Sequence, residues 1–487
     1  MRATCMRSQF IHAFCLLTLS LLAAGTAQPA VSESRGASQA PTTHYDTSIA
    51  AARTVAAALV QDADLPGLSI AVGIDGKLVW SEGFGYADLE QRTAVTPESR
   101  FRIGSVSKTL TATAVGLLAE RGKLDLDAPV QRYVPSFPLK EAPISTRQLA
   151  GHTAGIRNYN GDEFYSSRVY DSVVDSLSIF ANDPLIFRPG TDYQYTTYGW
   201  SVLSAVVEGA AGEPFLSFMQ REVFAALGMR HTMAEHMDAL IPDRVRYYAR
   251  DERQHLRNAR YVDNSNKWAG GGFISTPSDL VLFGLDHLQT GLLQRATAEL
   301  LMKPQTLESG RQTDYGIGWQ TRIDPHQRTM FGHGGGSVGG STAFATWPKE
   351  RMVVVATTNI TEDPGIFALA YVLGDIFLPP ADSPLPALPT SQAVLAFDSP
   401  AAGKLEAVSG TILLQRLPAG YSGWISAEGV LPFGRIVWGR AEPEGLHLIA
   451  TTPRGILNLW LQPQGKQYTG RWLGSDGERR VRARVRR

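Results

Sequence analysis

A proline-rich segment, residues 379–397, divides this chain of 487 residues into two parts of different character. Helical patterns alternate with β-rich runs before it, whereas residues 398–487 contain closely spaced β-rich runs, many glycines and four tryptophans. Proline lacks a backbone N–H and fixes its own φ, so a proline-rich run favours an extended connection. A chain of this length also exceeds what one hydrophobic core usually supports. The sequence therefore predicts a domain over residues 46–378, a linker over 379–397 and a small all-β domain over 398–487.

The end of the chain has a clear strand pattern. Val481, Ala483 and Val485 alternate with arginines within residues 479–487. Successive side chains of a strand point to opposite faces, so this alternation predicts a closing strand with one face in solvent. The alternative is an anion-binding patch.

Residues 1–27 have the pattern of a secretory signal peptide. Two arginines precede a short apolar run at 10–24, and small residues follow it at 25–27. The run is too short and too often interrupted by polar residues for a membrane span. We therefore expect an exported protein, periplasmic or secreted, with a flexible lead-in over residues 28–45. The alternative, a mitochondrial presequence, would be an amphipathic helix rich in arginine and serine.

Composition excludes several classes of function. Both cysteines, Cys5 and Cys15, lie in the expected signal peptide, so the mature chain has no disulfide, thiolate nucleophile or cysteine metal site. Lys plus Arg equals Asp plus Glu, 46 of each, so no net charge attracts nucleic acid or an anionic membrane. We expect no nucleic-acid partner and no membrane span after signal removal; the oligomeric state stays open.

Turn and capping residues locate several elements of the first domain. Asp75-Gly76 between two β-rich runs is typical of a hairpin, and Thr276-Pro277 with an acid at 279 is typical of a helix start. The pattern between about 125 and 300 is mostly helical. The expected helices include 47–60, 105–121 and 366–377, and the expected strands are 68–74, 77–83, 328–331, 341–347 and 352–358.

Ser105-Val106-Ser107-Lys108 is the only Ser-x-x-Lys in the chain, and it opens a helical stretch. Positions three apart share one face of a helix, which places the serine hydroxyl beside the lysine amine. A serine needs a neighbouring base to become a nucleophile, and a desolvated lysine with a lowered pKa can be that base. Alone, such a motif more often marks an N-cap serine and a solvated lysine.

Two later segments strengthen the catalytic interpretation of this motif. They are Tyr195-Thr196-Thr197 and Gly332-His333-Gly334-Gly335-Gly336, the second on a predicted strand. Alone, Tyr195 fits a core or surface aromatic residue, and His333 among glycines fits a tight turn. Glycines along a strand also permit close approach of a second backbone or of a substrate.

Taken in order, the three segments resemble the motifs of the serine β-lactamase and penicillin-binding-protein superfamily, in particular its class C-like branch of β-lactamases, D-amino-acid peptidases and esterases. Ser105-x-x-Lys108 matches the first motif, Tyr195-Thr196-Thr197 stands in place of Tyr-x-Asn, and His333-Gly334-Gly335 in place of Lys-Thr-Gly. The resemblance spans about residues 45–377. Further sequence segments that match the superfamily lie at 123–127, 146–155 and 261–273. The last of these is most similar to a mitochondrial branch of the superfamily.

The resemblance implies an α+β fold, in which an antiparallel sheet built from N- and C-terminal strands is flanked by helices, with a helical subdomain between. It implies that Ser105 is the nucleophile and that Lys108 takes its proton. It also implies that Tyr195 relays a proton to the leaving group and helps activate the deacylating water. The oxyanion hole would consist of the backbone N–H groups of Ser105 and Gly336. The substrate-binding residues would be His333, Gly334, Gly335 and Thr197. No cofactor or metal is expected.

Two departures from the superfamily motifs bear on the substrate. His333 replaces a lysine whose fixed charge recognises the β-lactam carboxylate, and imidazole is neutral for much of the time near pH 7. Thr197 replaces an asparagine whose amide would pair with a substrate amide. Both favour a peptidase, amidase or esterase, or a weak β-lactamase, that acts on a small-molecule or peptide substrate through an acyl-enzyme. The alternative is a catalytically silent binding or scaffolding protein.

Three rival motifs are weaker. Residues 335–339 match Gly-x-Ser-x-Gly, but a strand is expected after Ser337, where a nucleophile elbow requires a helix. His231 and His236 are five apart, which does not align two metal ligands on a helix. Neither glycine run is followed by the Lys-Ser/Thr of a phosphate-binding loop.

Overall fold

The computed structural model describes residues 44–485 apart from 325, 379–391, 402–404, 418–419, 429, 443–444, 466 and 475–476. Residues 44–487 form one compact unit. The expected signal peptide, nearly all of the lead-in, and residues 379–391 of the expected linker lie outside the described residues. Within the described part, no single helix is both long and apolar enough to cross a membrane; one pair of successive helices, bent by 75°, passes that test jointly.

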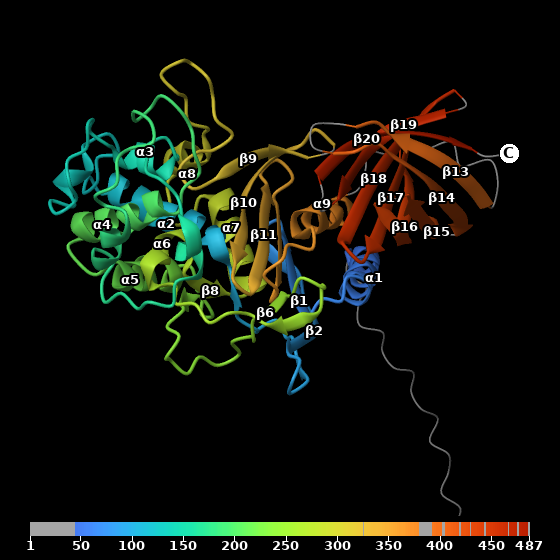
Figure 1. Ribbon diagram of the computed structural model, residues 1–487, viewed down its shortest axis with the longest axis horizontal. Helices are drawn as coiled ribbons and strands as arrows, with labels where there is room; N and C mark the ends of the chain where they lie inside the picture. The colour runs from blue at the N-terminus through green and yellow to red at the C-terminus, as the bar shows by residue number, and fades with distance from the viewer. Residues whose placement is uncertain are drawn as a thin grey trace, which may run out of the picture. The chain divides into compact units, whose positions relative to one another are not determined.

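A seven-stranded antiparallel sheet forms the centre of the first domain, with strand order β3-β2-β1-β12-β11-β10-β9 (Figure 1). N-terminal and C-terminal strands meet where β1 pairs with β12, which confirms the expected sheet. The strands are β1 Gly67–Ile74, β2 Lys77–Asp88, β3 Thr93–Ala94, β9 Gln320–Ile323, β10 Thr329–Ser337, β11 Gly340–Trp347 and β12 Met352–Thr358.

The β1–β2 hairpin turns at Asp75-Gly76, as expected, because both residues adopt positive φ. The central strands β1 and β12 are buried along their whole length, so both faces of the sheet are covered. Ile70 and Val354 pack with helices α1 (Asp46–Asp62) and α9 (Ile366–Phe377). Ala71 and Val355 pack on the other face with α7 (Pro277–Gln289) and the helical part of the chain.

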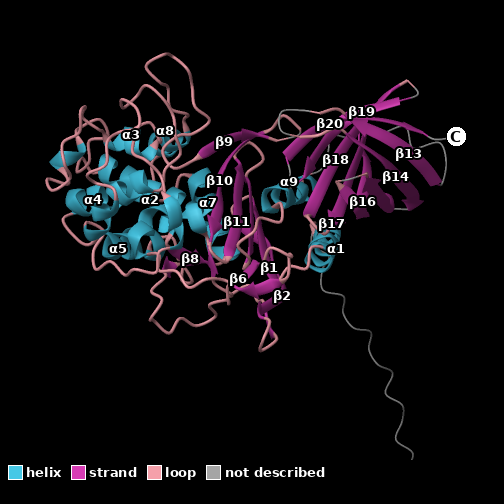
Figure 2. Cartoon of the chain, viewed as in Figure 1, coloured by secondary structure: helices cyan, strands magenta, loops and turns pink. Residues whose placement is uncertain are grey.

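The helical subdomain packs around α2 (Ser107–Glu120) and α4 (Tyr198–Ala211), as Figure 2 shows. The Thr276 side chain accepts a hydrogen bond from the Asp279 N–H, which confirms the expected start of α7. The other α-helices are α3 Thr146–Ala150, α5 Phe215–Phe218, α6 Trp268–Gly271 and α8 Arg295–Met302, with a π-helical segment at Met219–Ala225 and short 3₁₀ helices that include Val130–Arg132 and Ser265–Lys267.

The expectation of mostly helical structure was wrong for residues 151–197. Regular structure there consists of two short 3₁₀ helices, Gly161–Tyr165 and Asp175–Ile179. His152 and Gly155 have positive φ (61° and 75°), which no α-helix accommodates. Two prolines within the segment further exclude long helices.

The C-terminal part is a closed eight-stranded barrel, β13 to β20, which confirms the expected all-β domain. Its first strand begins at Gln392, inside the segment expected as linker. The closing strand is confirmed: Val481 and Ala483 are buried, and the arginines at 480, 482 and 484 are exposed. The barrel strands are β13 Gln392–Ser399, β14 Val408–Leu417, β15 Gly420–Ala427, β16 Leu431–Glu442, β17 Gly445–Thr452, β18 Gly455–Gln464, β19 Gln467–Gly474 and β20 Gly477–Val485.

Polar contacts join the barrel to the two helices that also cover the sheet. Asp62, at the end of α1, forms an ion pair with Arg435 of β16 at 2.9 Å and accepts a hydrogen bond from Thr451 of β17. Helix α9 contacts β18 as well as β11 and β12. The barrel therefore packs against the same helix layer that covers one face of the sheet.

Candidate active site

Ser105 lies on a 3₁₀ turn, Gly104–Val106, that leads directly into α2. Gly104 has φ 49°, and a Cβ atom there would lie 2.6 Å from the carbonyl oxygen of Gly336. A Cβ atom on Gly335 would lie 2.0 Å from the carbonyl oxygen of Ile103. Glycine at these positions therefore lets β10 pack directly against the serine turn. Gly336 itself is exposed, and its missing Cβ would meet no atom within 4 Å.

A buried ion pair holds this turn against the end of β10. The Arg102 guanidinium donates to Glu235 at 2.5 Å and to the carbonyl oxygen of Val338 at 2.7 Å. Both side chains are at most 1% exposed. Because Arg102 precedes Ser105 by three residues, these contacts fix where the helix starts relative to the strand.

Lys108 is fully buried, and its amine contacts three groups. Its Nζ lies 3.0 Å from the Ser105 hydroxyl oxygen, 2.7 Å from the carbonyl oxygen of Gly270 and 3.5 Å from the Thr197 hydroxyl oxygen. Burial, with a smaller effect of Lys267, lowers the pKa of Lys108 well below its ordinary value. The neutral amine that can accept a proton from Ser105 is thereby favoured.

Tyr195 lies over the lysine, with its ring centroid 4.8 Å from Lys108 Nζ. Its hydroxyl is buried and has no hydrogen-bond partner among the described residues. Burial raises the pKa of Tyr195, an effect that the nearby Ser105 hydroxyl partly opposes, so the phenol is protonated at neutral pH. The His152 ring stacks beside Tyr195 with a centroid distance of 4.2 Å.

His152 is held as a neutral imidazole. Its Nδ1 accepts a hydrogen bond from the Thr196 backbone N–H at 3.1 Å, which leaves the proton on Nε2. Burial, together with the charge of Lys108, lowers the pKa of His152 well below its ordinary value. His152 therefore orients the Tyr195 segment without adding a positive charge.

His333 is also buried and neutral, and both of its nitrogens are engaged. Nδ1 donates to the carbonyl oxygen of Gly334 at 2.6 Å, and Nε2 accepts from the Tyr315 hydroxyl at 2.9 Å. Burial, followed by the charge of Lys108, lowers the pKa of His333 to about 3. His333 thus lies next to the site, with both ring nitrogens engaged by groups of the protein.

The other expected site residues also gather here. Thr197 precedes α4, and its backbone N–H donates to the Asn158 side chain at 3.0 Å. Gly334 and Gly335 lie on β10 between His333 and Gly336. The structure therefore brings Ser105, Lys108, Tyr195, Thr197 and the 333–336 strand together, although they span more than two hundred residues of sequence.

Sequence reasoning missed four side chains and one carbonyl group of this site. Asn158 and Tyr315 had no motif that marked them, because their role depends on contacts to Thr197 and His333. Two sequence segments that supported the resemblance, 146–155 and 261–273, contain His152, Lys267 and the Gly270 carbonyl, but no role was assigned to these groups. The match of these two segments to the superfamily was the signal that could have identified the three groups.

A cavity of about 380 Å³ opens beside these residues. Tyr193 and Tyr315 belong to its lining, and their ring centroids lie 6.0 Å and 4.5 Å from that of His152. Its wall also includes Asp314 and Gln320, and Arg311, which is paired with Asp192 at 2.6 Å. The cavity adjoins the site through Tyr315, whose hydroxyl donates to His333.

Lys267 is a second buried lysine close to the site. Its Nζ donates to the carbonyl oxygen of Phe164 at 3.1 Å and lies over the rings of Phe164 and Tyr159. Burial and the charge of Arg102 lower the pKa of Lys267 to about 7, although Asp263 opposes the shift. The folded state therefore holds this amine at a cost in stability.

We expect Lys267→Met to stabilise the fold. An unfolded lysine has a pKa near ~10.4, so a folded pKa of about 7 corresponds to a penalty on the order of 4 kcal/mol. This penalty is fully present below about pH 7 and disappears as pH rises towards ~10.4, because the native state binds fewer protons than the unfolded state in that window. After loss of the Phe164 hydrogen bond, the net gain is about 2–3 kcal/mol near neutral pH.

Urea unfolding between about pH 6 and pH 10 measures this gain. The advantage of Lys267→Met over wild type shrinks as pH rises, whereas the exposed Lys123→Met control shows no such trend. A Lys267→Met variant less stable than wild type near pH 6 would contradict the argument.

The rival motifs find no support in the geometry. Ser337 ends β10, and β11 follows after a two-residue turn, so Gly-x-Ser-x-Gly lies in a β-hairpin rather than between a strand and a helix. The His231 backbone N–H donates to Asp279 at 2.7 Å, and the His236 ring packs 5.1 Å from that of Trp268. Neither histidine belongs to the three-residue metal-ligand group found in the described part of the chain.

The chain is similar to known proteins in sequence and in fold. The chain is 33% identical over 408 residues to the serine beta-lactamase-like protein LACTB, mitochondrial, of Bos taurus, covering 63% of this chain and 73% of that protein. It is 28% identical over 307 residues to penicillin-binding protein 4* of Bacillus subtilis, covering 59% of this chain and 67% of that protein. The solved octameric penicillin-binding protein homologue from Pyrococcus abyssi shares the fold with a TM-score of 0.59 and 19% identity. The match covers 89% of this chain and 99% of that structure.

The expectation of a periplasmic or secreted protein was wrong. The relatives from Bos taurus, Homo sapiens and Mus musculus are all named as mitochondrial proteins. The N-terminal pattern alone misled, because an arginine-containing start with an apolar run is shared by several targeting segments.

The sequence model described as beta-lactamase matches residues 52–374, from within α1 to within α9, and thus contains Ser105, Lys108, Tyr195 and His333. Two thirds of the chain, including every residue of the candidate site, therefore belongs to the beta-lactamase family.

Proposed function

We propose that this protein is an active-site serine hydrolase that cleaves an amide or ester bond through an acyl-enzyme intermediate. The observation that carries the proposal is the 3.0 Å distance between the Ser105 hydroxyl and the amine of Lys108, whose pKa is lowered by burial. A hydroxyl beside a neutral, desolvated amine is an activated nucleophile.

In the proposed reaction, Ser105 Oγ attacks the substrate carbonyl carbon while Lys108 Nζ takes its proton. The Gly270 carbonyl holds the amine in place by accepting one of its N–H bonds. The backbone N–H groups of Ser105 and Gly336 receive the developing oxyanion, supported by the packing of the serine turn against β10. Tyr195, protonated and directed at Ser105, gives its proton to the leaving group and recovers one from Lys108.

Charge at the site supports a substrate without a carboxylate beside the scissile bond. His152 and His333 are both neutral at pH 7, and both nitrogens of His333 are engaged. Neither imidazole therefore supplies the fixed positive charge that a carboxylate would need. Of the two arginines that line the neighbouring cavity, Arg311 and Arg322, the first is already paired with Asp192. An amidase, peptidase or esterase acting on a neutral acyl group fits this arrangement better than an efficient β-lactamase.

We expect Tyr195→Phe to slow steady-state turnover by about 10²–10³-fold, since it removes the group that protonates the leaving group and helps activate the deacylating water, but leaves nucleophile and base in place. A p-nitrophenyl ester, whose leaving group needs no protonation, still acylates Ser105 and gives a burst of nitrophenolate. Rapid-mixing kinetics separate the burst from the slow steady state. Tyr193→Phe, at a neighbouring ring of the same cluster, is the control; equal turnover rates for the two variants would rule out the relay.

Intact-mass spectrometry with a fluorophosphonate, a p-nitrophenyl ester and a penicillin, followed by peptide mapping, tests the proposal. We expect a fluorophosphonate adduct on Ser105, an ester that turns over, and a penicillin that reacts slowly or not at all. Ser337→Ala, which removes the serine of the rival motif, keeps the label. Absence of any adduct on folded protein would favour the binding or scaffolding alternative, and a label on Ser337 would refute the assigned nucleophile.

A further inference from the structure

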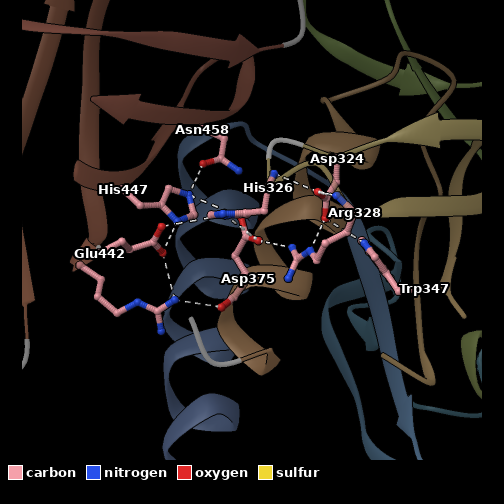
Figure 3. A network of polar contacts seen from close by, with 9 residues as sticks. Asp324, His326, Arg328, Trp347, Asp375, Glu442, His447 and Asn458 are labelled. Atoms are coloured by element: carbon pink, nitrogen blue, oxygen red, sulfur yellow. Dashed lines mark hydrogen bonds and ion pairs between the residues drawn. The ribbon is translucent and has the colours of Figure 1, made fainter. Parts of the chain in front are cut away.

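Four side chains of types that commonly ligate metals gather where the barrel meets the hydrolase domain (Figure 3). His326 lies on the loop between β9 and β10, Asp375 in α9, Glu442 at the end of β16, and His447 in β17. Asp375, Glu442 and His447 are buried, whereas the His326 side chain is 31% exposed. The group thus has an opening to solvent on the His326 side.

The distances among these side chains suit one small cation. His447 Nδ1 lies 3.4 Å from Glu442 Oε1, and His326 Nε2 lies 4.0 Å from Glu442 Oε2. One ligand atom from each of His326, Glu442 and His447 lies within 4.8 Å of the others. Ligands placed ~2.0–2.2 Å from a tetrahedral zinc ion are about 3.4 Å apart, so these atoms would move up to about 1.4 Å closer together on binding.

Buried atoms without hydrogen-bond partners point to the same position. Among the described residues, neither Nδ1 of His447 nor Oδ2 of Asp375 has a hydrogen-bond partner, and both side chains are at least 99% buried. The other nitrogen of His447, Nε2, bonds to the Asn458 side-chain oxygen. That bond places the proton on Nε2 and leaves the Nδ1 lone pair facing Glu442, the arrangement that supports an imidazole ligand in metal sites.

The charge balance of the cluster also favours a bound cation. Asp324, Asp375 and Glu442 contribute three negative charges, and Arg328 and Arg440 contribute two positive ones through contacts of 2.5 Å to Asp375 and 3.0 Å to Glu442. Neutral histidines leave one negative charge in excess in a buried environment. A proton on His326, whose pKa Asp375 raises against the effect of burial, competes for the same place. That proton would still leave His447 Nδ1 without a partner.

We propose that His326, Glu442 and His447 bind one divalent transition-metal ion of the zinc class, with Asp375 as an adjoining carboxylate. Two imidazole nitrogens and carboxylate oxygen form a donor set that suits Zn²⁺ and its analogue Co²⁺. The ion would fasten the barrel hairpin β16–β17 to the loop that leads into β10. The site departs from the expectation of no metal, and it is independent of the proposed hydrolase reaction.

The test uses the full-length, tag-free protein after dialysis against a chelator. Co²⁺ is added and its visible ligand-field absorption recorded, and thermal unfolding is followed with and without Zn²⁺. We expect a tetrahedral Co²⁺ spectrum at one equivalent and a rise in Tm with Zn²⁺, since a ligand that binds only the folded state stabilises it. Both signals should weaken at low pH, where protons compete for the histidines.

Variants locate the ion. His326→Ala and the nearly isosteric Glu442→Gln should weaken Co²⁺ binding at least tenfold while keeping the far-ultraviolet circular dichroism of wild type. His231→Ala, at a histidine of similar exposure (35%) outside the cluster, should bind like wild type. Absence of a Co²⁺ spectrum and of a Zn²⁺ shift in folded wild type would overturn the proposal and leave a proton-held ion-pair network. Equal binding by all three variants would also overturn it.

Discussion

Ser105→Ala is expected to lower kcat/KM for any substrate that wild type turns over by at least ~10⁴-fold. The variant removes the hydroxyl oxygen that lies 3.0 Å from the Lys108 amine and that we propose as the nucleophile. The fold should hold, because Ser105 is only partly buried and the turn depends on Gly104 and on the Arg102 contacts rather than on the hydroxyl. Steady-state hydrolysis of a p-nitrophenyl ester, with thermal unfolding of the same preparations, gives both results.

Ser337→Ala provides the matched control, since that serine lies three residues after Gly334 on the strand next to the site. It should retain wild-type kcat/KM within a few fold. Retention of full activity by Ser105→Ala would end the hydrolase mechanism argued above. Loss of activity accompanied by unfolding would instead show that the Ser105 hydroxyl is structural, which its geometry does not suggest.

Lys108→Met should be the second most damaging substitution, with acylation slowed by about 10²–10⁴-fold. Methionine is similar in volume to the buried lysine, so it fills the space left by the amine without supplying a base. Removing a buried amine also removes its desolvation penalty, so we expect no loss of stability. The size of the nitrophenolate burst and its rate constant report the acylation step directly.

The pH dependence gives an independent readout of Lys108. Its pKa is lowered, and only the neutral amine takes a proton, so acylation by wild type increases as pH rises through that lowered pKa. This limb should lie well below ~10.4 and should be absent from Lys108→Met. His333, with a pKa of about 3, contributes no limb near neutral pH. An unchanged profile in Lys108→Met would exclude the lysine as the base.

Local sequence patterns predicted much of the fold. The Asp75-Gly76 turn, the Thr276 cap and the apolar run of α9 depend on contacts within a few residues, and each was confirmed. The segment 151–197 was not predictable in this way. Its backbone follows long-range contacts, such as the hydrogen bond from Thr196 N–H to His152, and not local propensity.

The sequence by itself determined which chemistry is present: one Ser-x-x-Lys at a helix start, a tyrosine motif and a glycine-rich strand, in an order that one family shares. Only the tertiary structure decided the electrostatic state of these groups. Burial lowers the pKa of Lys108 and keeps His333 neutral, and desolvation depends on atoms contributed by distant segments. The cluster of His326, Glu442 and His447 likewise exists only because the barrel packs against the hydrolase domain, and no spacing along the chain records that contact.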